Sequence, residues 1–237
     1  MILCLYAVVS TPRTPLHIGG MRNERLTVIR AGSISGVVGR LARPPRQAPR
    51  SLRAYHEAIQ RLSDVVPALL PARFGTTFQS EAEVVALLRA RSASFRPVLA
   101  RVRRRVQMTV RFMPGRQPLP RLDETMSVSD RSSGIAYLRS RARAARRLAT
   151  WEPCVTLSHI AGQWIRAELF EERHGVVSVY HLIPRAAAAQ YRRAVEAGLP
   201  GARPQVTGPF PPFAFADPLG AAREAWPVSS RRRETHG

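Results

Sequence analysis

The sequence predicts an α+β protein built from two small domains. Stretches in which apolar residues alternate, as on a strand, are followed by stretches in which they recur at helical spacing, and this succession occurs twice. At 237 residues the chain is also longer than a usual single domain. The predicted domains are an N-terminal α+β domain at 1–104 and a modified ferredoxin-like domain at 105–216, followed by a disordered, arginine-rich tail at 217–237.

The first elements of the N-terminal domain are predicted to be strands. Residues 3–9 form an apolar run that indicates a buried strand, and residues 26–41 indicate one or two more, punctuated by glycines. After a proline-rich loop, a helix is predicted to begin at Ser51 and to end before Pro67. Its apolar stripe consists of Leu52, Tyr55, Ile59, Leu62 and Val66.

The decamer LLPARFGTTF, residues 69–78, predicts a further strand. Its alternating face consists of Leu70, Ala72, Phe74, Thr76 and Phe78. Ser80 and Glu83 then form a capping box, which begins a helix that we expect to run to Val102 and to bend at Pro97.

The second domain begins with a strand at 105–113. The polar, proline-rich stretch at 114–133 predicts a mobile loop, and a helix follows from near Gly134. Pro153 interrupts this helix, and a second helical piece is expected to reach about Arg173.

The remaining elements complete a β-α-β-α-β order. A strand is predicted at 176–184, a helix that ends at Gly198, and an extended segment at 203–215. This order favours a small sheet covered by helices on one side, a modified ferredoxin-like arrangement.

Composition favours a globular protein without identifying its partner. Hydrophobic residues make up 45% of the chain, and 37 basic residues against 16 acidic ones give a formal net charge of +21. Such a charge is typical of proteins that bind nucleic acid or an anionic surface. All 37 of these residues are arginine, however, and alanine, proline and glycine are plentiful, as a GC-rich codon bias alone would produce.

The N-terminal decamer MILCLYAVVS is apolar like the core of a signal peptide. No basic residue precedes it, and TPRTP follows it instead of a small-residue cleavage site. No apolar run reaches the ~18 residues needed to cross a bilayer. Cys4 and Cys154 are the only cysteines, so nothing indicates a disulfide framework. We expect a cytoplasmic protein that does not enter a membrane.

No residue pattern of a catalytic, cofactor-binding or metal-binding site is found in the sequence. Cys154 and His159 lie five apart on a predicted helix without a third group to orient them, so we expect them to be structural. One group of histidines and glutamates lies close together in the sequence and could be imagined as metal ligands, but its spacing matches no zinc-binding pattern. They are His159, His174, His181, Glu168, Glu171 and Glu172. The prediction is a protein that is not an enzyme and binds no cofactor.

An arginine-rich nucleic-acid or anionic-surface binding protein is the alternative. RVRRR at 101–105 and RSRARAARR at 139–147 could contact phosphates. The second cluster is also the expected polar face of an arginine-only helix, and no stacking aromatic residues are interleaved with it. Nucleic acid is therefore the less favoured partner.

Two segments are not explained by folding requirements alone. LLPARFGTTF carries Arg73 inside an otherwise apolar stretch. In VTGPFPPFAF, residues 206–215, three prolines fix φ and remove donors, so the backbone must be extended. Within this segment, Phe210, Phe213 and Phe215 form an aromatic strip.

Together with three further motifs, these segments resemble the gas vesicle accessory proteins of the GvpL/GvpF family. In that family an LYxxV strand, an LPxRFGT segment, a GxxYLxxR helix, an FLVP-like strand and a terminal TGPWPPYxF segment occur in this order. The corresponding stretches here are residues 5–9, 70–76, 134–139, 179–184 and 207–213. Phe210 and Phe213 stand where the family usually has Trp and Tyr, and Gln107 stands where a glutamate is common.

The resemblance implies a non-enzymatic role in forming gas vesicles, the gas-filled, protein-walled organelles that give some prokaryotes buoyancy. The implied partners are the hydrophobic shell protein and other gas vesicle accessory proteins, and the implied role is that of an assembly factor or minor vesicle component. Because a shell subunit exposes apolar surface before it polymerises, a protein that covers it needs an apolar surface of its own. The candidate partner-binding residues are Phe210, Pro211, Pro212, Phe213 and Phe215.

The structural signature residues that the resemblance singles out are Arg73, Phe74, Gly75 and Tyr137. Two glutamates lie in the first turn of the helix that follows the RFGT stretch. We expect Arg73 to be a partly buried clamp that pairs with a carboxylate or with backbone carbonyls and fixes the corner across Gly75.

Overall fold

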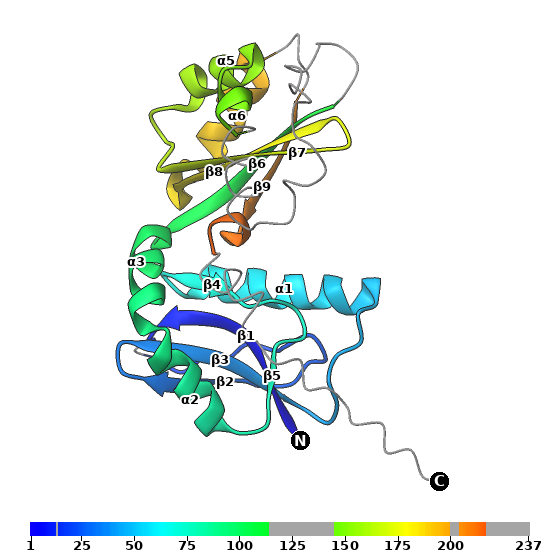
Figure 1. Ribbon diagram of the computed structural model, residues 1–237, viewed down its shortest axis with the longest axis vertical. Helices are drawn as coiled ribbons and strands as arrows, with labels where there is room; N and C mark the ends of the chain where they lie inside the picture. The colour runs from blue at the N-terminus through cyan, green and yellow to red at the C-terminus, as the bar shows by residue number, and fades with distance from the viewer. Residues whose placement is uncertain (13, 114–144, 200–203, 217–237) are drawn as a thin grey trace, which may run out of the picture. The chain divides into compact units, whose positions relative to one another are not determined.

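The computed structural model describes residues 1–12, 14–113, 145–199 and 204–216. These residues form two compact units, one of Met1–Arg101 with Phe215 and Ala216, and one of Val102–Ala214. Each unit combines an antiparallel sheet with helices (Figure 1), so the predicted α+β class is confirmed. The predicted loop at 114–133, the start of the helix near Gly134 and the tail at 217–237 lie outside the described residues.

The N-terminal unit is organised around β1, which pairs with three other strands. The strand order is β2-β3-β1-β4, and β5 also pairs with β1. All these pairings are antiparallel. The strands are β1 (Ile2–Ser10), β2 (Leu26–Ala31), β3 (Ile34–Leu41), β4 (Leu69–Pro71) and β5 (Thr77–Phe78).

Helices cover both faces of this sheet, α1 (Pro49–Val65) on one side and α2 (Glu81–Ala90) on the other (Figure 1). Tyr55 of α1 belongs to the same core cluster as Tyr6 of β1. On the opposite face, Val84 of α2 approaches the backbone of Gly36 in β3 so closely that a Cβ there would lie 3.1 Å from its Cγ1 atom. Since successive side chains of a strand point to opposite faces, this double cover explains why β1 is buried along nearly its whole length.

Two predictions for this unit are wrong in detail. LLPARFGTTF is not one strand, because a turn separates β4 from β5. The helix after the confirmed Ser80 cap does not continue to Pro97; it ends at Ala90 with Arg91 as its C-cap, and a new helix, α3 (Ser92–Val102), contains Pro97. Arg91 makes the break because its amide donates to Leu87 O, closing α2, while its carbonyl accepts from Phe95 N in the first turn of α3.

The C-terminal unit has a four-stranded antiparallel sheet with strand order β7-β8-β6-β9. Its strands are β6 (Arg105–Phe112), β7 (Ala167–Arg173), β8 (Val176–Pro184) and β9 (Gln205–Phe210). Its helices are a piece at 145–149, α5 (Glu152–Ala161), η2 (Arg185–Ala187) and α6 (Ala188–Gly198). The short helix η3 (Phe213–Phe215) begins in this unit, while its last residue, Phe215, belongs to the N-terminal unit. Among the described residues, and with 145–149 and α5 counted as one helical segment and η2 and η3 left aside, the elements follow one another as β-α-β-β-α-β, the order of the ferredoxin-like motif.

One face of this sheet packs against α5 and α6. Val106, Met108, Val110 and Phe112 of β6 share a core cluster with Leu157 of α5. Tyr191 and Val195 of α6 belong to the same cluster. The alternate residues of β6, Gln107 and Thr109, point to the other face and are buried as well.

β7 corrects the prediction of a helix that reaches Arg173. β7 and β8 form a hairpin whose register pairs Arg173 with Val176. The two loop residues, His174 and Gly175, both have positive φ, +52° and +77°. This is the backbone of a tight hairpin turn whose twist matches that of the flanking strands.

Candidate functional site

The five candidate partner-binding residues lie in the segment that follows Thr207. β9 pairs with β6 with a shift in register, so that Thr207 lies beside Thr109 and Phe210 beside Gln107. The Gly208–Pro209 peptide bond is cis, and Gly208 has φ +116°. A Cβ atom at Gly208 would lie 2.7 Å from the carbonyl oxygen of Gln107, so only glycine fits between the two strands.

The structure divides the five residues into exposed and buried ones. Phe210 is 38% exposed and Phe213 is 37% exposed. Pro211 and Pro212 are buried. Phe215 is also buried and belongs to the N-terminal unit, where Arg101 donates from Nη2 to its carbonyl oxygen at 3.1 Å.

Two side chains that were not singled out as site residues hold the backbone of this segment. Arg192 of α6 donates to the carbonyl oxygen of Val206 at 3.1 Å and also to that of Gly208. Gln107 accepts from the Ala214 amide at 2.8 Å through Oε1 and donates from Nε2 to the Thr109 hydroxyl. Nothing in the sequence distinguishes Arg192 from other helical arginines, and Gln107 was noticeable only as a departure from the family pattern.

The RFGT stretch is a tight corner between β4 and β5. Gly75 has φ +84°, a conformation that favours glycine. Thr76 donates to the carbonyl oxygen of Arg73 from its amide at 3.1 Å and from its hydroxyl at 2.8 Å. The Thr76 carbonyl in turn accepts from the amide of Leu5 at 2.9 Å, which attaches the corner to β1.

The aromatic ring of Phe74 connects this corner to α1. It meets Tyr55 edge to face, with ring centroids 5.3 Å apart, and Tyr55 stacks on Tyr6 at 5.1 Å. The Tyr55 hydroxyl donates to the carbonyl oxygen of Ala72 at 2.8 Å. The LYxxV and LPxRFGT motifs are therefore brought together through a tyrosine that neither motif contains.

Arg73 does not form the expected clamp. Its side chain is exposed, and within the part of the chain that the structure describes its guanidinium has no hydrogen-bond or ion-pair partner. Only its backbone carbonyl fixes the corner, and a carbonyl is common to every residue type. Tyr137, the fourth signature residue, lies outside the described residues.

A polar network starts at the other end of Tyr6. The Tyr6 hydroxyl donates to Glu24 Oε1 at 2.5 Å and accepts from the Met21 amide at 2.8 Å. Burial, followed by the bond to Glu24, raises the pKa of Tyr6 above its usual value. The Tyr6 hydroxyl therefore stays protonated and ties β1 to the turn before β2.

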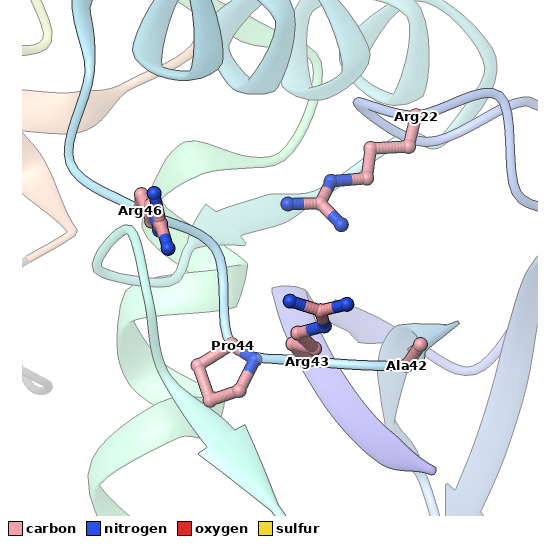
Figure 2. Close-up of a pocket in the computed structure, with 5 residues that line it drawn as sticks. All are labelled: Arg22, Ala42, Arg43, Pro44 and Arg46. Atoms are coloured by element: carbon pink, nitrogen blue, oxygen red, sulfur yellow. The ribbon is translucent and has the colours of Figure 1, made fainter.

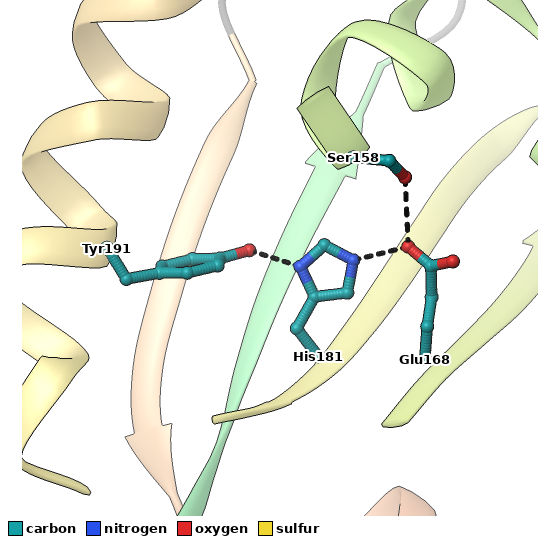
Figure 3. Close-up of polar contacts among 4 residues, drawn as sticks. All are labelled: Ser158, Glu168, His181 and Tyr191. Carbon is teal, nitrogen blue, oxygen red and sulfur yellow. Dashed lines mark hydrogen bonds and ion pairs between the residues drawn. The ribbon is translucent and has the colours of Figure 1, made fainter. Parts of the chain in front are cut away.

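A second polar network lies on the helix-covered face of the C-terminal sheet (Figure 3). His181 of β8 is fully buried; its Nε2 lies 2.6 Å from Glu168 Oε1, and its Nδ1 lies 2.6 Å from the Tyr191 hydroxyl. Ser158 of α5 donates to the same glutamate oxygen at 3.4 Å. Burial, followed by the charge of Glu168, raises the pKa of Tyr191, so the hydroxyl is available to donate to the histidine.

This network connects two helices to two strands. Of the ligand-like residues in the sequence, it unites only Glu168 and His181. Within the described ranges, no three side chains of His, Cys, Asp or Glu are grouped to hold a metal ion. Burial raises the pKa of the Cys154 thiol to about 12, so at neutral pH it carries its proton and is not a thiolate nucleophile. No helix among the described residues combines the length and the apolar character needed to cross a membrane.

The geometry defines a two-unit α+β protein in which sequence motifs far apart along the chain are hydrogen-bonded or packed together. The chain belongs to the gas vesicle synthesis protein GvpL/GvpF family, whose model matches residues 3–217. The family resemblance expected from the five motifs is thereby confirmed.

Solved structures show the same fold. Gas vesicle protein GvpF from Microcystis aeruginosa is similar with a TM-score of 0.68 and 15% identity over 91% of this chain and 98% of that one. GvpF from Anabaena sp. PCC7120 is similar with a TM-score of 0.67 and 15% identity over 91% of this chain and 95% of that one. No curated protein sequence matches this chain.

Proposed function

We propose that this protein is a non-enzymatic accessory protein of gas vesicle formation that binds the hydrophobic shell subunit and other accessory proteins. It acts at the gas vesicle, as an assembly factor or as a minor component of the vesicle. The family that the chain belongs to supports the process. The choice of partner is supported by the surface at the end of β9.

Phe210 and Phe213 carry this proposal. Both residues are more than one third exposed, although phenylalanine is a residue that folded proteins mostly bury. The backbone is held on both sides of them: Arg192 bonds to the carbonyl oxygen of Val206 before them, and Gln107 bonds to the amide of Ala214 after them. A shell subunit that has not yet polymerised exposes apolar surface, and preformed aromatic contacts bind such a surface with little loss of conformational freedom.

In each of the two basic clusters, one arginine forms a contact within the chain. Arg101 donates to the carbonyl oxygen of Phe215 at 3.1 Å. In the second cluster, Arg147 lies 3.5 Å from Glu172. Because these two arginines are engaged within the chain, they are less available to the phosphates of a nucleic acid.

Co-expression with the shell protein tests the proposal. The tagged protein is purified together with shell protein, and the retained amount is compared with that of Phe210→Ser/Phe213→Ser. The matched control is Val155→Ser/Leu169→Ser, which also removes two exposed apolar side chains from the C-terminal unit. We expect the phenylalanine variant to lose most of the retained shell protein and the control to keep it.

Two outcomes would contradict the proposal. One is equal retention by both variants, and the other is retention by an unrelated protein of similar basic charge. Retention that vanishes in moderate salt would point to the charge and not to the phenylalanines, because contacts between apolar groups are not weakened by salt.

A further inference from the structure

A hollow in the N-terminal unit is lined mainly by arginines. It has a volume of about 490 Å³ and lies beside the loop that joins β3 to α1. Figure 2 shows the side chains of Arg22 and Arg43 extending into the same space from two different segments, with Arg46 at its margin. The other lining residues are Ala42 and Pro44.

The positive charge of this hollow is not balanced within the described chain. No carboxylate lines it, and the three guanidinium groups are exposed without a hydrogen-bond or ion-pair partner among the described residues. Two other arginines of the same unit differ in this respect. Arg40 pairs with Glu81 at 2.5 Å, and Arg61 donates to the carbonyl oxygen of Gly19 at 3.0 Å.

Glu24, which lies two residues from Arg22, does not pair with the guanidinium groups of the hollow. One of its carboxylate oxygens accepts from the Tyr6 hydroxyl and the other from the backbone amide of Arg22. The carboxylate is therefore bonded to groups other than the Arg22 guanidinium. The loop ends at α1, whose first turn contains no acidic residue and whose N-cap has no side-chain bond.

The geometry points to a docking site for an acidic segment of another protein, with the three guanidinium groups binding its carboxylates. Arginine presents its donors in a planar fork that fits a carboxylate with two parallel hydrogen bonds. The three arginines gather around one hollow, so successive acidic side chains of one segment can engage them together. Ala42 and Pro44 offer apolar contact to the methylene groups of the same side chains.

The shape of the hollow favours a peptide over a small oxyanion. Its volume of about 490 Å³ is larger than a small oxyanion needs. Ala42, Arg43 and Pro44 are all exposed, so the hollow is open along the loop and can admit a chain. This site shares no residue with Phe210 and Phe213, and its occupant is defined by charge, so the inference goes beyond the proposed binding of the shell subunit.

Fluorescence anisotropy with a defined probe tests the inference. The probe is a short labelled peptide in which glutamate alternates with serine, titrated with the full chain at ~0.15 M salt. The hollow variant is Arg22→Gln/Arg43→Gln/Arg46→Gln. The matched control, Arg89→Gln/Arg96→Gln/Arg193→Gln, removes three other exposed arginines and lowers the net charge equally. Unchanged thermal midpoints establish that both variants are folded.

We expect the hollow variant to bind the peptide about tenfold more weakly or worse, and the control to stay within about twofold of the unchanged protein. Equal losses in both variants, or no binding by the unchanged protein, would overturn the inference. Displacement of the peptide by inorganic phosphate but not by acetate at equal ionic strength would assign the hollow to an oxyanion instead. An equally large loss of duplex DNA binding in the hollow variant would assign it to polyanions in general, which also overturns it.

Discussion

The hydroxyl of Tyr55 donates to the carbonyl oxygen of Ala72 at 2.8 Å and lies 3.2 Å from the carbonyl oxygen of Tyr6. Through this one side chain, α1 holds the end of β4 and the middle of β1. Tyr55 is almost fully buried, and burial raises its pKa well above the usual value, so the hydroxyl keeps the proton that it donates. The RFGT corner thus depends on a residue of a helix outside the motif.

Replacing Tyr55 with phenylalanine should lower the free energy of unfolding by about 1–3 kcal/mol, because the buried Ala72 carbonyl loses its side-chain donor. For a protein of this size each kcal/mol lowers the thermal midpoint by about 2–4 °C. Tyr180→Phe is the matched control, since its hydroxyl bonds to Glu171 in a less buried position. A thermal scan in which both variants lose the same amount would contradict a special role for Tyr55.

The sequence located the RFGT corner but did not predict its shape. The alternation in LLPARFGTTF is real, yet its two phenylalanines lie on different elements. Phe74 packs against Tyr55 from the turn, whereas Phe78 is buried on a new strand opposite Leu3. Apolar residues at every second position over ten residues could not distinguish one strand from two strands joined at Gly75. The turn keeps the apolar side chains directed toward the core, as a continuous strand would.

Gly208→Ala should be more destabilising than Gly75→Ala. Both positions have positive φ, which costs a residue with a Cβ about 1–2 kcal/mol. A Cβ at Gly75 meets nothing within 4 Å, whereas one at Gly208 would lie 2.7 Å from the carbonyl oxygen of Gln107. Urea unfolding of both variants measures the difference, which we expect to exceed about 1 kcal/mol. Equal losses would show that β9 can move away from β6 at little cost.

Burial of the two thiols predicts a loss of stability at alkaline pH. Burial raises the pKa of both Cys4 and Cys154 from 9.0 to about 12. The unfolded chain therefore releases these protons at lower pH than the folded one. The stabilisation is fully present below pH 9 and is lost as the pH rises from 9 to about 12.

The variant Cys154→Ala isolates one of these contributions. Between pH 9 and 12 its free energy of unfolding should fall less steeply than that of the unchanged protein, by up to about 1.4 kcal/mol per pH unit. The lost side-chain volume shifts the whole curve downward but leaves its slope unchanged, and the buried tyrosines contribute equally to both proteins. Parallel curves from urea titrations at several pH values would contradict the prediction.

The hairpin of β7 and β8 shows why another element was not predicted. β7 is an edge strand whose residues are only partly buried, so no strict alternation marks it, and its glutamates and apolar residues fit a helical period as well. The signal that could have identified it is the pair His174 and Gly175, which forms a two-residue turn directly before the apolar strand β8. The network of His181 was equally hidden, because Glu168 reaches His181 only when β7 pairs with β8.

His181 and Tyr191 should be energetically coupled. His181→Leu leaves the buried Tyr191 hydroxyl without its partner, and Tyr191→Phe leaves Nδ1 of His181 without one, so each change should cost about 1–3 kcal/mol. The double variant leaves neither group orphaned and should cost less than the sum, by about 0.5–3 kcal/mol. Urea unfolding of the two single variants and the double variant measures this coupling.

Tyr6→Phe serves as the control partner, because Tyr6 bonds to Glu24 and Met21 and shares no contact with His181. The effects of Tyr6→Phe and His181→Leu on the free energy of unfolding should therefore add within about 0.5 kcal/mol. Additivity of His181→Leu with Tyr191→Phe would instead mean that the 2.6 Å contact adds nothing to stability.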